Sequence, residues 1–208
     1  MTTKVYDAVI IGAGSVGLPT AFFLAKAGLQ PLVIDQFASP GQGSNKAAIG
    51  GIRATHSAPS KIRLCLKSLE VFSTWERRYG DDIEWYRGGY SFVAYREREE
   101  QALKALLNKQ QEFGLDIRWL DRDELLEVIP DLNAKNLIGG TYSPKDGSAS
   151  PLLSAHAFYT RAKEHTPPAR FHFNERVTGI ISRRGKVVGV RTDKGGYATE
   201  TVINAAGP

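Results

Sequence analysis

The chain has a single cysteine among its 208 residues. This scarcity excludes an intrachain disulfide and any cysteine-rich metal or iron–sulfur site. Cys65 has Leu64, Leu66 and Leu69 as neighbours, which is typical of a buried structural thiol rather than a nucleophile. The four histidines, His56, His156, His165 and His172, show no HExxH motif and no short HxxxH spacing. We therefore expect no metal site.

The sequence also lacks a basic stripe and a long apolar run. The net charge is +5, and basic residues mostly alternate with acids, as in residues 96–99, so nucleic-acid binding is not expected. No stretch is long enough to span a bilayer. The apolar segment from Ala8 to Ala27 follows the acidic Asp7 and contains a glycine motif, which argues against a signal peptide. We expect a cytoplasmic protein with no membrane span.

That glycine motif is the most informative feature of the chain. The apolar run Ala8-Val9-Ile10-Ile11 leads directly into Gly12-Ala13-Gly14-Ser15-Val16-Gly17. A helical segment follows, and a second apolar run, residues 31–34, ends on Asp35. The order of strand, glycine turn, helix, strand and acid is the fingerprint of a dinucleotide-binding βαβ unit.

Each part of the fingerprint has its own physical role. Gly12 allows a tight turn, Gly14 lets a pyrophosphate approach the backbone, and Gly17 lets the helix pack closely on the sheet. The amino end of the helix presents N–H groups and a positive dipole to phosphates, and Asp35 can accept hydrogen bonds from a ribose. The alternative is an ordinary βαβ turn whose glycines serve packing only.

The rest of the chain predicts an α/β protein with two domains. Residues 83–148 alternate between strand-like and helical segments, and we predict that they form an α+β domain inserted into the nucleotide-binding domain, which comprises residues 1–82 and 149–208. Short strands separated by turns near the carboxyl end predict an antiparallel meander. Its expected strands are Val177–Ser182, Lys186–Thr192 and Tyr197–Val202.

Several separate motifs carry a family resemblance. They are the opening fingerprint, the loop from Gly43-Ser44 to Gly50-Gly51-Ile52-Arg53, the segment Asp146–Pro151 and the closing segment Val202–Pro208. In this order they resemble the FAD-dependent D-amino-acid oxidase superfamily, and within it the branch of sarcosine oxidase, glycine oxidase and the dye-linked proline dehydrogenase β-subunit. The resemblance extends from Tyr6 to Pro208.

The resemblance implies a Rossmann-like FAD-binding domain with the antiparallel meander, and an inserted α+β substrate domain. It implies a flavoprotein oxidase or dehydrogenase that oxidises the C–N bond of a small amino acid or secondary amine, such as sarcosine, glycine or proline. In such enzymes a hydride passes to flavin N5. The resemblance implies the following FAD-binding residues: Gly12, Gly14, Ser15, Val16, Gly17, Asp35, Gln36, Gly43, Ser44, Asn45, Lys46, Ala47, Gly50, Gly51, Ile52, Val177, Ala205, Ala206 and Gly207.

Two residues are candidates for the substrate site. Arg53 matches an arginine that holds the substrate carboxylate in monomeric sarcosine oxidases, and a guanidinium can grip a carboxylate through two hydrogen bonds. The alternative is a surface arginine paired with an acid. His56 follows three residues later and could face the same cavity, or be a hydrogen-bonded structural histidine.

Other interpretations stay open at this point. An NAD-dependent oxidoreductase could use the same fingerprint, and a non-catalytic FAD-binding subunit could retain it within a larger complex. A partner subunit or a homo-oligomer is compatible with either flavoprotein interpretation. Because the chain stops at Pro208 within a motif that family members continue, we expect it to be the amino-terminal portion of a longer protein and to bind FAD weakly by itself.

Overall fold

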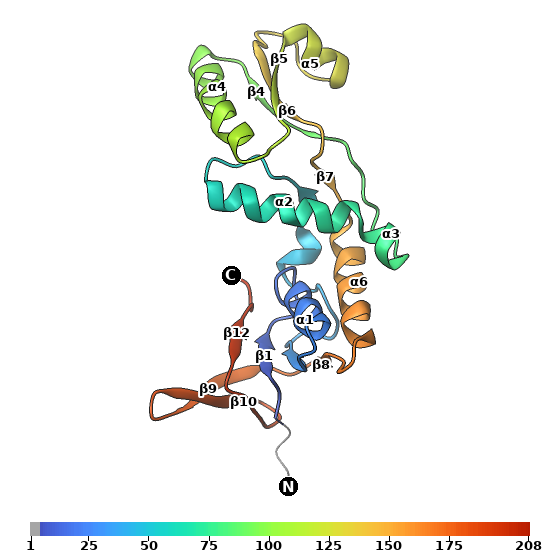
Figure 1. Cartoon of the computed structure of the whole chain (residues 1–208), viewed down its shortest axis with the longest axis vertical. Helices are drawn as coiled ribbons and strands as arrows, with labels where there is room; N and C mark the ends of the chain where they lie inside the picture. Colours follow the sequence, from blue (N-terminus) through green and yellow to red (C-terminus); the bar gives the residue numbers. More distant parts are fainter. Residues whose placement is uncertain (1–4) are drawn as a thin grey trace. The chain divides into compact units, whose positions relative to one another are not determined.

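The computed structural model describes residues 5–208, which form two compact units (Figure 1). The first unit comprises the chain up to Ile49 together with Ser150–Pro208, and the second comprises Gly50–Ala149. The chain therefore leaves the first unit once and returns to it. The first unit has helices on a parallel sheet, which confirms the predicted α/β class.

Four parallel strands form the sheet of the first unit, in the order β12-β1-β2-β8. The strands β1 and β2 are apolar throughout and almost wholly buried, as expected for parallel strands that are covered on both faces. Figure 1 shows β12 beside β1, with α1 close by. The bounds of the strands are Ala8–Ile11 (β1), Pro31–Ile34 (β2), Arg170–His172 (β8) and Val202–Asn204 (β12).

Two helices pack against each other in this unit. They are α1, Gly17–Lys26, and α6, Pro151–Glu164. The rings of Phe22 and Phe158 meet edge to face with their centroids 5.6 Å apart. Pro151 occupies the first position of α6, where its missing N–H has no cost, and the Ser150 hydroxyl caps the helix. A short 3-10 helix, η1, covers Ser44–Ala47.

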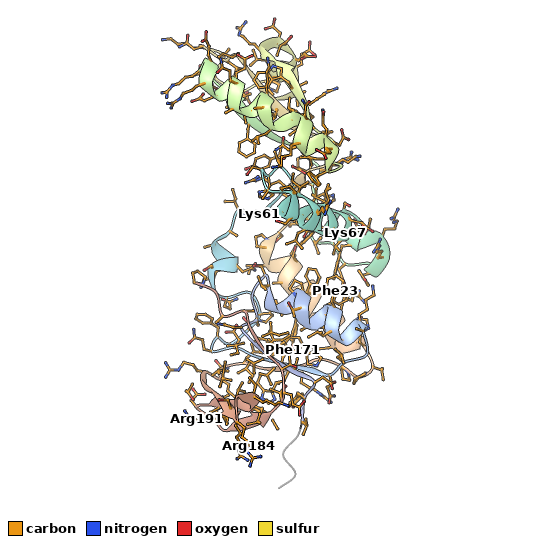
Figure 2. The ribbon with its side chains drawn as sticks, turned by 60° about the vertical axis from the view of Figure 1, so that its left-hand side comes forward. Phe23, Lys61, Lys67, Phe171, Arg184 and Arg191 are labelled. Atoms are coloured by element: carbon orange, nitrogen blue, oxygen red, sulfur yellow. The ribbon has the colours of Figure 1, made fainter. Side chains whose placement is uncertain are left out.

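The predicted meander is present, but its last strand was predicted wrongly. The strands are β9 (Val177–Arg183), β10 (Lys186–Thr192) and β11 (Gly196–Ala198), and Arg184 projects from the β9–β10 turn (Figure 2). The predicted strand 197–202 is broken at Thr199, whose hydroxyl accepts a hydrogen bond from the Thr201 amide and donates one to the Thr201 carbonyl. This turn moves the chain from the antiparallel sheet to the parallel sheet, where it continues as β12.

The second unit contains an antiparallel sheet in the order β4-β6-β5 and a two-stranded pair of β3 with β7. The Asp121 side chain accepts from the Glu124 amide and the Glu124 side chain accepts from the Asp121 amide, a capping box that starts α5. The strands are β3 (Gly51–Ile52), β4 (Tyr90–Ala94), β5 (Arg118–Asp121), β6 (Gly139–Ser143) and β7 (Gly147–Ser148). The helices are α2 (Pro59–Ser73), α3 (Trp75–Tyr79), α4 (Glu97–Glu112) and α5 (Arg122–Val128).

The boundary at which the second unit begins differs from the predicted one. Residues 50–82 were expected with the nucleotide-binding domain, but they belong to the second unit, which begins at Gly50. The reason is the core of this unit, where Ile62 and Leu69 of α2 pack with Leu115 and Ile117. The spacing of apolar residues predicts that α2 buries one face, but it does not say which core receives that face.

Within residues 5–208, no helix is both long and apolar enough to cross a membrane. The same residues contain no cluster of three or more His, Cys, Asp or Glu side chains suited to a metal ion.

We predict that the second unit depends on the buried face of α2. The Ile62 side chain is fully buried, whereas Leu64 is 68% exposed on the same helix. Ile62→Ala should lower the free energy of unfolding of this unit by about 2–5 kcal/mol, because it removes buried methyl groups and leaves a cavity. Leu64→Ala is the matched control and should change it by less than about 0.5 kcal/mol. Denaturant titration followed by hydrogen exchange of residues 50–149 checks this, and equal effects of the two substitutions would contradict the packing.

Candidate functional site

A cavity of about 950 Å³ lies in the first unit, at the carboxyl ends of the parallel strands. Ligands of open α/β sheets bind at this edge, where the strands end and the loops begin. Most of the predicted cofactor-binding residues line the cavity: Gly12, Gly14, Ser15, Val16, Asp35, Gln36, Gly43, Ser44, Asn45, Lys46, Val177, Ala205, Ala206 and Gly207. Segments that are far apart in the sequence therefore meet at one site.

The three glycines of the fingerprint differ in what surrounds them. A Cβ atom at Gly12 would lie 2.3 Å from the Ala205 carbonyl oxygen, and one at Gly17 would lie 1.9 Å from the Gly12 carbonyl oxygen. Gly12 also has a φ of 103°, which disfavours a side chain. A Cβ atom at Gly14 would have no atom within 4 Å. Gly12 and Gly17 therefore serve backbone packing, whereas Gly14 leaves open space along the wall of the cavity.

The Asp35 carboxylate holds the glycine turn to the end of β2. Its Oδ2 accepts a hydrogen bond of 2.6 Å from the Ala13 amide, and its Oδ1 accepts one of 2.8 Å from the Phe37 amide. A carboxylate has about four acceptor positions, so two backbone bonds leave room for hydroxyl donors from a ligand. Asp35 is thus both a structural tie and an available acceptor at the cavity.

The loop after β2 is attached to the same turn. The Gly41 amide donates to the Ala13 carbonyl at 2.8 Å, and the Asn45 side-chain amide donates to the Pro151 carbonyl at 2.9 Å. These bonds hold η1 against the cavity and the start of α6. Lys46, on η1, adds a cation to the cavity wall, which suits an anionic ligand.

A partly buried hydrogen-bond network supports the meander side of the cavity. The Glu175 carboxylate accepts from the Thr192 hydroxyl at 2.6 Å and from the Tyr197 hydroxyl at 2.9 Å, and His172 Nδ1 lies 2.7 Å from that phenol oxygen. Burial, followed by the hydrogen bond and the charge of Glu175, raises the pKa of Tyr197 to about 12. The network fixes the chain just before Val177, which lines the cavity.

A second cavity, of about 260 Å³, lies within the second unit and contains both residues predicted for the substrate site. The Arg53 guanidinium lies over the rings of Tyr90 and Phe92, 5.2 and 5.1 Å from their centroids, and donates to the Thr55 carbonyl. Among the residues that the structure describes, no carboxylate forms an ion pair with Arg53. The other lining residues are Thr55, His56, Ser57, Leu103, Leu106, Gln110 and Thr141.

Asp146 holds the segment that follows Arg53. It is fully buried, and its carboxylate accepts from the Ala54 amide at 3.2 Å and from the Thr55 hydroxyl at 2.7 Å. Burial raises the pKa of Asp146, and these hydrogen bonds together with the charge of Arg53 oppose the rise. Burial and the nearby cations Arg53 and Lys61 lower the pKa of His56, which favours the neutral imidazole.

Some predicted cofactor residues lie outside the large cavity. Gly17 and Ala47 are in the first unit but do not line it, and Gly50, Gly51 and Ile52 belong to the second unit. Ile52 packs against the core of that unit, and Gly51 pairs with Ser148. Sequence reasoning missed eight lining residues: Ile11, Ile34, Phe37, Gln42, Glu175, Arg176, Asn204 and Pro208. Seven of them are next to a predicted residue in the sequence, and that adjacency is the signal that could have found them. Glu175 is not next to a predicted residue, and no sequence signal points to it.

We predict that the Glu175–Tyr197 network makes the free energy of unfolding decrease as the pH rises above 10. The pKa of folded Tyr197, about 12, lies above its ordinary value of 10.0, so the stabilisation is complete below pH 10 and is lost as the pH rises toward 12. Tyr197→Phe should lower the free energy of unfolding by about 1–3 kcal/mol at neutral pH, because Glu175 loses a donor. The same substitution should make the free energy of unfolding fall less steeply between pH 10 and 12. Denaturant titrations at neutral pH and between pH 10 and 12 measure both effects, and Tyr86→Phe, at an exposed tyrosine, is the control. If the free energy of unfolding of Tyr197→Phe falls as steeply with pH as that of the unsubstituted protein, the role of Tyr197 is contradicted.

Comparison with known proteins places the geometry in a family. The structure matches the crystal structure of L-proline dehydrogenase from P. horikoshii with a TM-score of 0.91 and 30% identity, over 98% of this chain and 53% of that one. Glycine oxidase from Geobacillus kaustophilus (strain HTA426) is 29% identical over 213 residues, which cover 99% of this chain and 55% of the relative.

A third relative, the mitochondrial pyruvate dehydrogenase phosphatase regulatory subunit of Mus musculus, is 24% identical over 199 residues, 96% of this chain and 22% of its own length. The chain thus spans from about a fifth to about half of the length of these relatives. The family model described as FAD dependent oxidoreductase (DAO) matches residues 7–208. The chain belongs to this family of FAD-binding flavoproteins.

Proposed function

We propose that the first unit holds FAD in its large cavity. Gly14 takes the pyrophosphate against the backbone at the amino end of α1, Asp35 accepts from the adenosine ribose, and the Val177 backbone meets the adenine. Residues 44–47 and 205–207 lie along the remainder of the cofactor. The open space at Gly14, set among glycines that admit no side chain, supports this placement.

We further propose that the protein oxidises the C–N bond of a small amino acid or secondary amine. FAD, when bound, supplies the hydride acceptor at its N5 atom. The chain supplies the carboxylate site, because Arg53 lies in a small cavity and forms no ion pair with any of the described residues. A guanidinium already held by two aromatic rings loses little freedom when it binds a carboxylate and orients the substrate.

The position of Arg53 in this cavity, without an ion pair to any of the described residues, is the observation that carries this proposal. The names of the similar proteins, L-proline dehydrogenase and glycine oxidase, agree with a small amino acid. The family match favours FAD over the nicotinamide alternative. The similarity to a phosphatase regulatory subunit supports a second candidate, an FAD-binding subunit that does not turn over an amine.

The first test separates the two roles of the fingerprint glycines. Gly14→Ala should leave the thermal midpoint of the apoprotein unchanged, because its φ is not positive and nothing lies near the added methyl group. It should raise the Kd for FAD by about tenfold or more, equivalent to about 1.4 kcal/mol. Gly17→Ala is the matched comparison and should lower stability by about 1–3 kcal/mol. Flavin fluorescence titration and thermal unfolding measure these quantities, and unchanged FAD affinity in Gly14→Ala would sink the placement of the pyrophosphate.

The second test follows the visible spectrum of the flavin-loaded protein at its native length. Anaerobic sarcosine or L-proline should bleach the flavin. Arg53→Ala should raise KM by about tenfold to a hundredfold, because a hydrogen-bonded charge contact is lost. Arg98→Ala, at an exposed arginine of α4 that does not line the cavity, should leave KM unchanged. A flavin that stays oxidised with every small amine tested would favour the non-catalytic subunit.

A further inference from the structure

The cavity around Arg53 contains a buried amide that the proposed carboxylate site does not use. Gln110 is the only buried residue of α4, and it is 4% exposed. Its Nε2 donates a hydrogen bond of 3.0 Å to the His56 carbonyl. A carbonyl can only accept, so this bond fixes the orientation of the amide and leaves Oε1 as an acceptor.

Gln110 Oε1 has no hydrogen-bond partner among the residues that the structure describes. The same holds for the Thr141 hydroxyl, and both residues line the cavity that contains Arg53. A buried polar atom without a partner is costly, and native proteins leave few of them. A ligand that brings an N–H donor into the cavity would remove this cost.

We propose that Gln110 Oε1 accepts the N–H of the substrate amine and so selects amino acids over simple carboxylates. This inference rests on the proposed function. With the carboxylate on Arg53 and the amine on Gln110, the side chains of Leu103 and Leu106 leave an apolar wall for a small substituent. A neutral secondary amine can donate its one N–H to Gln110 and keep its lone pair, the form from which hydride transfer starts. A neutral acceptor suits this form better than a carboxylate, which would favour the ammonium.

The test compares each amine with the acid in which CH₂ replaces NH, in the flavin-loaded protein at its native length. The pairs are sarcosine with butanoate and L-proline with cyclopentanecarboxylate. Gln110→Met should lower kcat/KM for the amine by about tenfold more than it raises the inhibition constant of the acid, because both ligands lose the bond from Gln110 to the His56 carbonyl but only the amine loses an acceptor. Arg53→Ala should weaken both members of a pair.

Two further variants separate amine recognition from a structural role. Gln110→Glu keeps an acceptor but loses the donor to His56. At a pH high enough to keep the bound amine neutral, it should retain more of kcat/KM for the amine than Gln110→Met does, and it should move the pH profile of kcat toward higher pH, because a carboxylate raises the pKa of the bound amine. Ser91→Ala removes another buried hydroxyl without a partner, but Ser91 does not line the cavity, so both members of a pair should be unaffected.

The outcomes distinguish this inference from the proposed function. The role of Gln110 would be overturned if Gln110→Met weakened the amine and the acid equally or weakened neither. It would also be overturned if Gln110→Glu lost as much kcat/KM for the amine as Gln110→Met. If Arg53→Ala leaves both ligands unchanged, the carboxylate site itself is wrong. A larger loss for the amine than for the acid in Gln110→Met, with rescue of the amine in Gln110→Glu, supports amine recognition.

Discussion

The close approach of three backbone segments determines the whole first site. The Gly12 amide donates to the Ile34 carbonyl and the Ala205 amide donates to the Ile11 carbonyl, so the turn is bonded to the strands on both sides of β1. There is no space for a side chain between Gly12 and Ala205, or between Gly17 and Gly12. The position of α1 over the sheet therefore depends on glycine at these sites, and the cavity beyond Gly14 exists because the helix starts where it does.

Side chains from distant segments then hold this arrangement. Asp35 and Gly41 both bond to Ala13, from the end of β2 and from the following loop. On the opposite side, Glu175 gathers hydroxyl groups from the meander. Both carboxylates accept hydrogen bonds from protein donors, and Asp35 keeps acceptor positions for a ligand, whereas Lys46 and Arg176 bring positive charge to the cavity. The two cations offset the charge of the two carboxylates on the cavity wall.

In the second unit, too, side chains from distant segments hold an irregular segment in place. The residues after Arg53 are held from two directions, by Asp146 on Ala54 and Thr55 and by Gln110 on the His56 carbonyl. The sequence separations of these contacts are 92, 91 and 54 residues. A short irregular segment with few bonds of its own thereby gains a defined conformation, and a defined conformation is what an arginine needs in order to orient a substrate.

The sequence by itself determined the features that depend on neighbouring residues. The apolar runs of β1 and β2, the glycine turn and the acid at position 35 are local patterns with one structural meaning. They were sufficient to predict the α/β class and the dinucleotide edge of the sheet, whereas the family resemblance implied most of the residues that line the large cavity. The functional roles of those residues stay predictions.

Only the tertiary structure decided which segments share a core or a cavity. It assigned α2 to the second unit, ended β11 at Ala198 so that the chain could pair with β1, and brought Gln110 and Asp146 to the segment after Arg53. No local pattern marks Gln110, because a buried glutamine on a charged helix looks like any solvated one until its partner is known. Periodicity tells which face of an element is buried, and long-range packing alone tells what that face meets.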